Sequence, residues 1–541
     1  SFNIDEGPLT QVRQIRFEGV EAFTRAQLLA LIKIKTGAAL SLKDLDETRQ
    51  ILKDFYTSEG YLEMKITNEK ERGGIVSYND SNTQANVQFN IYEGPRVIVR
   101  EVDIKGNSFT KDHVIRRELT FAPGDVLTPD KIADSTLRLQ SLGLFSRVDV
   151  RMPDAGTALA ERTIQVEVDE AIPGDVRIGI GANNEQELTF RGYVAASYSN
   201  LNGTGRGLHL RIEPKYSTEP RISYIENRTT LSYLEPYVFG IRNRGRVNLV
   251  RDQSFFGYTG TADAIIQEEN SVGFLLEKEL SRTLKLTTTV YSFANQLQFN
   301  RRTKDTLSTQ NIAKTGPLLE FDTRDNIANA TKGVYTFINA EYSDPAIGSS
   351  QDATQTIHFA KTNASFSFYQ QLFGKRDLIW ANSLRGGYLA NLSNASNSGV
   401  PSQESFFLGG RATIRGFDAN DLERIPNRID LGIPSLANFR MTSDSHYYLI
   451  KSEIRFPLWR NSPVGQLGGV FFYDGGAVIL SQLELPDPYR DAAGFGLRLE
   501  TPVGPINLEI GWKLDRRLLQ VGTPSDIRES AWAFHFSIGS F

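Results

Sequence analysis

The sequence contains no cysteine in its 541 residues. This absence excludes a disulfide scaffold and any thiolate metal site, and it is compatible with a location outside the cytoplasm. The chain also lacks an excess of positive charge, because 60 Lys and Arg residues stand against 64 Asp and Glu residues and leave a net charge of -4. Proteins that bind nucleic acid carry a basic surface. We therefore expect no nucleic acid among the partners.

Long apolar runs are also missing. The mean hydropathy is -0.32, and no stretch approaches the run of about 20 apolar residues that a membrane-spanning helix needs. A spanning β-barrel is not excluded, because its strands alternate apolar and polar residues and look hydrophilic to an averaging window. The chain opens at Ser1 without a charged and then apolar export signal. We expect that such a signal was removed or never included.

Motifs of catalysis and metal binding are absent as well. The five histidines are scattered and form no His-Glu-x-x-His or Cys/His cluster. The segment from Gly203 to Gly207 has Leu208 where a dinucleotide fingerprint requires its third glycine. No Gly-x-Ser-x-Gly elbow and no Walker loop occurs. We expect a protein that is not an enzyme and that has no catalytic residues, no metal and no cofactor.

A repeated segment divides the first third of the chain. The peptide Phe2 to Pro8 recurs as Phe89 to Pro95, with Glu-Gly-Pro at the end of each copy, and the same alternation returns as Val166, Val168 and Glu170. These segments mark three domain ends. We expect residues 1–8 to be the last strand of a truncated preceding unit, followed by whole units at 9–95 and 96–173.

Each whole unit is predicted to fold as strand, helix, helix, strand, strand (βααββ, of the α+β class). Capping residues mark the start of each second helix: Ser41 with Asp44 in one unit, and Thr128 before Pro129 in the other. The apolar positions of the two helices of the first unit are Leu28, Leu29 and Ile32, then Leu45, Leu52 and Phe55. The two closing strands are predicted at Leu62, Met64, Ile66 and Val87, Phe89, Ile91 in the first unit, and at Val148, Val150, Met152 and Ile164, Val166, Val168 in the second.

Residues 174–541 have the pattern of an all-β region. Helical periods vanish, and short alternating segments follow one another between turn residues. In one of them Leu208, Leu210 and Ile212 alternate with His209, Arg211 and Glu213. This alternation predicts one apolar face toward lipid and one polar face toward a watery lumen. At about 10 residues per strand the region suits a transmembrane barrel of about 16 antiparallel strands. A soluble β-sandwich or propeller would also alternate, but its core would not accept these charged groups.

The βααββ units that end in Glu-Gly-Pro resemble POTRA domains, the periplasmic modules of the BamA superfamily. A second feature carries the same resemblance, because residues 406–417 contain Ile414, Arg415, Gly416 and Phe417, similar to the Val-Arg-Gly-Phe motif of that family. The segments 321–326 and 496–512 match the family too. The resemblance therefore covers nearly the whole chain.

The resemblance implies that the motif lies on a long loop, at about 400–445, that folds back into the lumen. It also implies that Arg415 pairs with carboxylates of the inner wall, and the family pattern points to Glu453 and Asp474. A guanidinium in a partly dehydrated lumen would need such planar acidic partners, and a neighbouring glycine lets the backbone approach the wall. The polar stretch from Asp421 to Asp444 makes this loop longer than the family pattern.

The final strand resembles the C-terminal β-signal by which such barrels are recognised for their own assembly. We expect the signal and the seam between the first and last strands to use the residues Phe534, Phe536, Ile538, Gly539 and Phe541. Gly179 and Gly181 in the first strand region would weaken strand pairing at the seam.

The function implied by the resemblance is outer-membrane protein assembly. POTRA edges would receive unfolded β-barrel clients in the periplasm of a Gram-negative-type bacterium, and a lateral seam would insert them into the outer membrane. The expected partners are these clients, accessory lipoproteins or other periplasmic subunits bound to the POTRA domains, and membrane lipid. Two alternatives stay open: a TamA-like translocation and assembly barrel, and a two-partner secretion pore that exports one dedicated substrate. A passive solute porin would not need the periplasmic repeats.

Overall fold

The computed structural model describes residues 9–70, 74–184, 188–218, 224–258, 264–327, 329–352, 355–374, 377–393, 400–418, 444–462, 465–481, 488–501, 504–520 and 527–539. The described chain forms two compact units. One unit holds the residues up to Pro173 together with Ser199–Gly205, and the other holds Gly174–Tyr198 and the residues from Arg206 onward. None of the helices in the described ranges is long and apolar enough to cross a membrane.

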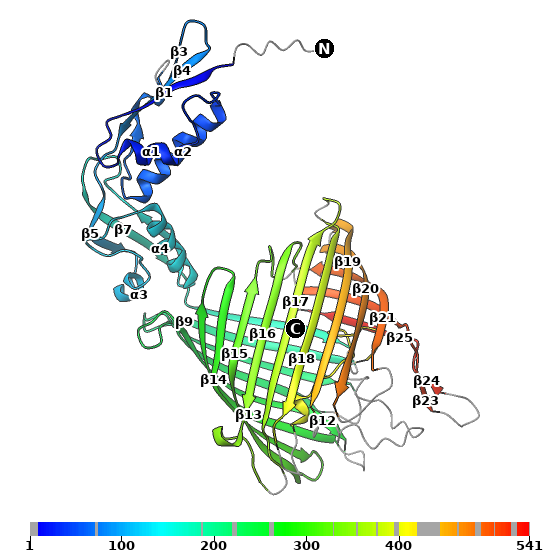
Figure 1. Cartoon of the computed structure of the whole chain (residues 1–541). Helices are drawn as coiled ribbons and strands as arrows, with labels where there is room; N and C mark the ends of the chain where they lie inside the picture. The colour runs from blue at the N-terminus through cyan, green and yellow to red at the C-terminus, as the bar shows by residue number, and fades with distance from the viewer. Residues whose placement is uncertain are drawn as a thin grey trace, which may run out of the picture. The chain divides into compact units, whose positions relative to one another are not determined.

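The first POTRA domain is a small sheet covered by two helices (Figure 1). Its elements are β1 (Gln11–Glu18), α1 (Arg25–Leu31), α2 (Leu42–Ser58), β2 (Lys65–Ile66), the 3-10 helix η1 (Thr67–Lys70), β3 (Val76–Tyr78) and β4 (Gln84–Tyr92). Strand β4 is central, with β1 parallel on one side and β2 and β3 antiparallel on the other. The Ser41 hydroxyl accepts a hydrogen bond from the Asp44 N–H at 3.2 Å, so α2 begins at the predicted cap.

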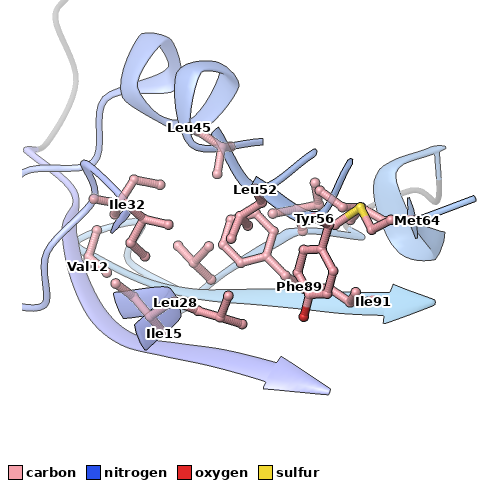
Figure 2. Close-up of a cluster of buried hydrophobic side chains, with 14 residues drawn as sticks. Val12, Ile15, Leu28, Ile32, Leu45, Leu52, Tyr56, Met64, Phe89 and Ile91 are labelled. Atoms are coloured by element: carbon pink, nitrogen blue, oxygen red, sulfur yellow. The ribbon is translucent and has the colours of Figure 1, made fainter. Parts of the chain in front are cut away.

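Figure 2 shows the apolar core between the helices and the sheet of this domain. Leu28 and Leu52 from the helices and Phe89 from β4 are all fully buried. Leu29, an apolar position of the predicted first helix, is by contrast 37% exposed. The helix α1 ends at Leu31, and its short length gives it room for only one buried residue. Helix α2 and strand β4 each contribute three residues to this core: Leu45, Leu52 and Tyr56 from α2, and Val87, Phe89 and Ile91 from β4.

The second strand of this domain is shorter than predicted. Leu62 and Met64 precede β2, whose two residues pair with Tyr92 and Ile91 of β4. After β2 has ended, the side chain of Asn68 continues the contact with β4, because its Nδ2 donates to the carbonyl of Gln88 at 2.9 Å and its Oδ1 accepts from the Asn90 N–H at 3.1 Å. A polar side chain has thus taken the place of strand backbone, which a hydropathy pattern does not reveal.

The second POTRA domain repeats the plan with β5 (Ile98–Lys105), α3 (Asp112–Arg116), α4 (Pro129–Ser141), β6 (Phe145–Arg151) and β7 (Glu161–Glu170). The strand order is β5-β7-β6, with β5 parallel and β6 antiparallel to β7. Thr128 caps α4 with Pro129 in the first turn, as predicted. Met152 lies one residue beyond β6.

The same carboxylate position secures the loop before the first helix in both domains. Glu93 accepts from the Ala22 N–H at 3.0 Å and from the Tyr56 hydroxyl at 2.7 Å. Its counterpart Glu170 accepts from the N–H of Thr110 at 2.5 Å and from the Ser108 hydroxyl at 2.7 Å. The glutamate of the repeated domain end therefore has a structural role in each POTRA domain.

The second unit is a closed barrel of 16 antiparallel strands, as predicted. Its strands, in chain order, are β8 (Gly174–Asn183), β9 (Thr189–Leu201), β10 (Arg206–Ser217), β11 (Ile225–Glu235), β12 (Arg244–Tyr258), β13 (Ala264–Glu279), β14 (Leu284–Asn300), β15 (Thr306–Asp322), β16 (Gly333–Ser343), β17 (Phe359–Gln371), β18 (Ile379–Asn391), β19 (Ser445–Ser462), β20 (Gly465–Leu480), β21 (Arg490–Thr501), β22 (Gly504–Lys513) and β25 (Trp532–Ile538). The remaining elements are not part of the barrel wall: η2 (Pro345–Ile347), η3 (Ser402–Glu404) and the hairpin of β23 (Leu518–Gln520) with β24 (Ile527–Arg528).

Alternation along the strands sets the inside and the outside of the barrel. In β10 the side chains of Leu208, Leu210 and Ile212 are 39%, 39% and 40% exposed, whereas the residues between them are less exposed. In β25 Ala533, His535 and Ser537 are buried, and the aromatic residues between them point outward. The outer wall is apolar and the lumen polar, which is the arrangement that lipid requires.

Barrel closure depends on the short contact between β25 and β8. Ser537 pairs with Asn183 and Ile538 with Ala182, and these are the two residue pairs of the seam among the residues that the structure describes. On its other side β25 pairs with β22 over the whole length from Trp532 to Ile538. The described part of the seam is therefore much shorter than its neighbouring strand pair.

Gly179 has a packing role that the sequence did not suggest. A Cβ atom built on it would lie 2.2 Å from the ring of Tyr193 on β9. The glycine thus makes room for an aromatic ring that crosses the strand. Whether Gly179 and Gly181 also weaken the seam stays a prediction.

Candidate functional site

The motif residues lie inside the barrel, on the loop between β18 and β19. The loop forms a tight turn, in which the Gly410 N–H donates to the carbonyl of Phe417 at 2.9 Å. Ile414, Arg415 and Phe417 are 0%, 1% and 1% exposed. The stretch from Asp421 lies outside the described residues up to Asp444, where the described chain resumes. The described part of the loop is thus packed into the lumen.

Arg415 is surrounded by carboxylates from three strands. Its Nε and Nη2 donate to the two oxygens of Asp474 on β20, at 2.6 and 2.8 Å. Its Nη1 donates to Glu453 on β19 at 2.7 Å and to Glu509 on β22 at 3.1 Å. Asp474 and Glu509 are themselves 0% and 1% exposed. The structure thus brings the motif arginine to both residues named from the sequence and to a third carboxylate that was not named.

Further cations balance the charge of this cluster. Arg498 on β21 donates to Glu453 at 3.0 Å and to Glu509 at 2.9 Å. Arg411 on the loop reaches the other oxygen of Glu509 at 3.2 Å. The Arg415 guanidinium also lies over the ring of Phe472, 3.6 Å from its centroid. Buried charges are stabilised only when they are paired in this way, because desolvation is costly.

Two glycines allow the loop backbone to touch the wall. A Cβ atom on Gly416 would lie 2.4 Å from the Ala492 Cβ, and one on Gly511 would lie 2.4 Å from the Arg415 carbonyl oxygen. Glycine on the loop and glycine on β22 are therefore both needed for this approach. The sequence argument named the first and missed the second.

The motif phenylalanine is held between two cations. The Arg490 guanidinium lies 4.7 Å and the Lys513 ammonium 4.6 Å from the centroid of the Phe417 ring. Arg490 in turn binds Glu529, with hydrogen bonds of 3.0 and 2.5 Å. Glu529 lies between β24 and β25, so these contacts connect the motif to the segment that leads into the last strand.

The last strand also touches the motif directly. His535 on β25 is 1% exposed, and its Nε2 lies 2.8 Å from the carbonyl oxygen of Arg415. Around it, Phe534 and Phe536 have ring centroids 6.4 Å apart. Gly539 has a φ of 92° and donates its N–H to Pro505 at 3.0 Å. Phe541 lies outside the described residues. Strand alternation could have placed Glu509 and His535 on the inner face, but it does not show which inner residues meet the loop.

A second ionic contact anchors the start of the loop. Glu404 in η3 accepts from Lys314 on β15 at 2.8 Å and from Lys361 on β17 at 3.1 Å. Phe406 packs beside it in an apolar cluster with Phe359. The loop is therefore attached to strands on both sides of β18 in the strand order: β15 and β17 on one side, and β19, β20 and β22 on the other. The described residues contain no group of His, Cys, Asp and Glu placed to hold a metal ion.

Comparison with known proteins gives consistent matches. The Omp85 superfamily domain matches residues 200–541, and the POTRA model, described as a surface antigen variable number repeat, matches residues 10–94 and 97–171. The chain is 25% identical over 556 residues to the outer membrane protein assembly factor BamA of Nitratidesulfovibrio vulgaris. That alignment covers 100% of this chain and 63% of the relative, so the chain spans less than two thirds of its length. BamA of Neisseria meningitidis is 25% identical over 238 residues, 43% of this chain and 28% of that protein.

Solved structures show the same fold. BamA from Haemophilus ducreyi lacking POTRA domains 1-3 has a TM-score of 0.69 at 17% identity, and the match covers 98% of this chain and 99% of that one. CdiB from Acinetobacter baumannii has a TM-score of 0.53 at 14% identity, covering 99% of this chain and 90% of that one. The barrel with attached POTRA domains is thus common to both kinds of protein, and the chain lies nearer in fold to the first.

Proposed function

The chain belongs to the Omp85 superfamily, and on this premise we propose that it receives unfolded β-barrel proteins in the periplasm and inserts them into the outer membrane. The protein is an outer-membrane β-barrel with periplasmic POTRA domains.

The short seam is the observation that carries this proposal. Within the described residues, Ala182 and Asn183 are the residues of β8 that pair with β25. The remaining outer edge of β8 carries Val176, Ile178 and Ile180, which are 69%, 73% and 80% exposed. Unpaired strand backbone is unfavourable in lipid and is satisfied when another strand pairs with it. An apolar strand edge beside a weakly closed seam is suited to accept a strand of an inserting barrel.

The POTRA sheets offer edges for earlier capture of the same clients. Strand β6 is an edge of the second sheet, and β1 is an edge of the first. An extended segment can add to such an edge through backbone hydrogen bonds, with little demand on its side chains. Accessory periplasmic subunits would use the same surfaces. No nucleotide is needed, because strand pairing and apolar burial in lipid are themselves favourable.

The lumen contacts favour insertion through the wall over export through the lumen. The loop residues around Arg415 and Glu404 are anchored on two separate stretches of the barrel wall, and a substrate that passed through the lumen would have to displace them. A two-partner secretion pore therefore agrees less well with this loop. The TamA-like alternative is separated from the proposal by its partners.

A reversible seam disulfide tests the proposal. The chain has no cysteine, so Asn183→Cys with Ser537→Cys introduces the single possible disulfide, between residues that pair across the seam. Reconstituted in liposomes, the reduced protein should accelerate folding of a urea-denatured small outer-membrane barrel, measured by the heat-modifiable shift in gel mobility. Oxidation should abolish the acceleration, and reductant should restore it.

The matched control places the disulfide in a long strand pair. Ser367 on β17 and Ser383 on β18 are paired, with their hydroxyl oxygens 3.1 Å apart. The pair Ser367→Cys with Ser383→Cys should leave client folding unchanged in both redox states. Equal client folding by the oxidised and the reduced seam variant would refute insertion through the seam.

A further inference from the structure

Asn184 follows directly after β8 and contacts the last strand with its side chain. Its Nδ2 donates to the carbonyl oxygen of Phe534 at 2.8 Å, and its Oδ1 accepts from the Phe536 N–H at 2.8 Å. Both backbone groups belong to β25, where Phe536 and Phe534 lie one and three residues before Ser537, at which the described pairing of β25 with β8 ends. The side chain thus continues the seam beyond the described backbone pairing.

The chemistry of this contact is that of strand pairing. A carboxamide carries one N–H donor side and one carbonyl acceptor, as a peptide group does. The carbonyl of one strand residue and the N–H of the residue two positions later point to the same edge of a strand. Asn184 therefore satisfies the two edge groups of β25 that a neighbouring strand would otherwise use.

The same arrangement occurs a second time in this chain, in a purely structural setting. Asn68 bonds the carbonyl of Gln88 and the N–H of Asn90 on β4, which are again two residues apart. It is 2% exposed and is held by a third hydrogen bond, from Nδ2 to Gly74 at 2.7 Å. Asn184 is only partly buried. A side chain at such a place can leave by rotation about its own bonds, whereas a paired strand must separate as a whole.

From this comparison we propose that Asn184 is an exchangeable substitute for a strand residue, which holds the edge of β25 until an extended client segment takes its place. The proposal rests on the proposed function and adds the residue that keeps the resting seam closed. The client group that replaces Asn184 is backbone, so the exchange is tolerant of client sequence. Because the amide must leave before a client strand can pair at Phe534 and Phe536, its loss opens the seam and speeds client capture.

The experiment measures the seam without any client. In the Asn183→Cys, Ser537→Cys protein, the disulfide is equilibrated against a series of glutathione redox buffers, which gives the effective concentration of one thiol near the other. Adding Asn184→Ala should lower that effective concentration about tenfold, the equivalent of about 1.4 kcal/mol for two neutral hydrogen bonds that face partial solvent. Asn184→Leu keeps a side chain of similar size and should give the same decrease.

Two controls separate the seam from general destabilisation. The Ser367→Cys, Ser383→Cys pair should keep its effective concentration in the Asn184→Ala background. Asn68→Ala should destabilise the first POTRA domain and leave the seam pair unchanged. An effective concentration at the seam that stays constant in Asn184→Ala, or that Asn184→Leu restores, would overturn the proposal.

The client assay separates this inference from the proposed function. Without engineered cysteines, Asn184→Ala should increase the initial rate of client folding relative to the unaltered protein. If the unaltered protein fails to accelerate folding at all, the proposed function is wrong, whereas the seam measurement still decides the role of Asn184. If the unaltered protein accelerates folding and Asn184→Ala slows it, the proposed function stands and the substitute role of Asn184 is wrong.

Discussion

Each of the two units buries one arginine completely, and the two arginines are held in different ways. Arg162 in the second POTRA domain is 0% exposed, and Arg415 in the barrel is 1% exposed. Arg162 donates to the carboxylate of Glu63 in the first POTRA domain at 2.8 Å. Its other donors reach carbonyl oxygens of its own loop, those of Asp154, Thr157 and Leu159.

The barrel arginine instead meets three carboxylates from strands far apart in the sequence. Glu453 and Glu509 share one nitrogen of Arg415, so they would repel one another without it. Around Arg162, neutral carbonyl oxygens of its own loop take the place of the water that would solvate the guanidinium. Arg162 therefore stabilises the contact between neighbouring POTRA domains, whereas Arg415 stabilises a loop whose position depends on distant strands.

The largest effect is expected from Arg415→Ala. It leaves buried carboxylates without their main partner, which costs about 3–5 kcal/mol. Arg415→Lys should recover only part of the loss, because an ammonium cannot bind Asp474 in bidentate fashion. Urea unfolding followed by heat-modifiability, together with client folding in liposomes, measures both variants.

Arg251, whose side chain is 60% exposed in its pair with Glu268, supplies the control, and Arg251→Ala should change little. Unchanged client folding and barrel stability in Arg415→Ala would show that Arg415 does not secure the loop.

A smaller and local effect is expected from Arg162→Met. Methionine keeps much of the apolar volume but leaves Glu63 and the loop carbonyls without their charged donor, at a cost of about 2–3 kcal/mol. Amide hydrogen exchange should increase at the loop that ends at Arg162 and near Glu63, while the barrel stays protected. If exchange rose equally in the barrel, the arginine would not be a local joint.

The smallest effect is expected from Glu170. Its carboxylate is held by neutral N–H and O–H donors, just as the Arg162 guanidinium is held largely by neutral carbonyl oxygens. Burial raises the pKa of this carboxyl group, but hydrogen bonds from the side chains of Thr110 and Ser108 and from the N–H groups of Thr110 and Phe109 outweigh it and lower the pKa to about 2. Because the folded pKa lies below the ordinary value of 4.5, the stabilisation is complete above that value and is lost as pH falls toward about 2.

Glu170→Gln should therefore cost about 1–2 kcal/mol near neutral pH and remove the pH dependence in that window. The measurement is hydrogen exchange of the Phe109 and Thr110 amides, followed from about pH 5 to about pH 2. Equal acid sensitivity of these amides in the glutamine variant would assign the dependence to another group.

Local patterns in the sequence predicted a large part of the fold. Capping residues such as Ser41 and Thr128 and strand alternation such as that of β10 act over a few residues, so they are visible without a structure. Strand ends were less predictable, because the strand expected at Leu62, Met64 and Ile66 is reduced to Lys65–Ile66. Asn68 replaces strand backbone through bonds to β4 that only the folded domain supplies.

The candidate site divides in the same way. The motif itself and two carboxylates near it were named from the sequence. The structure adds Glu509 and His535 as contacts of the loop, and Arg498 as a cation that pairs with Glu453 and Glu509. Alternation places all three on strands but does not set how far each strand is shifted against the next. The shift between strands is decided by the closed barrel.

The sequence by itself determined the two repeats, the apolar and polar faces of the strands and the identity of the motif, because each depends on residues a few positions apart. The tertiary structure alone decided which carboxylates surround Arg415 and that Asn184 meets β25, 350 positions later in the chain. Closing a sheet into a cylinder brings its first and last strands together, and the register of all the strands between them sets which residues meet.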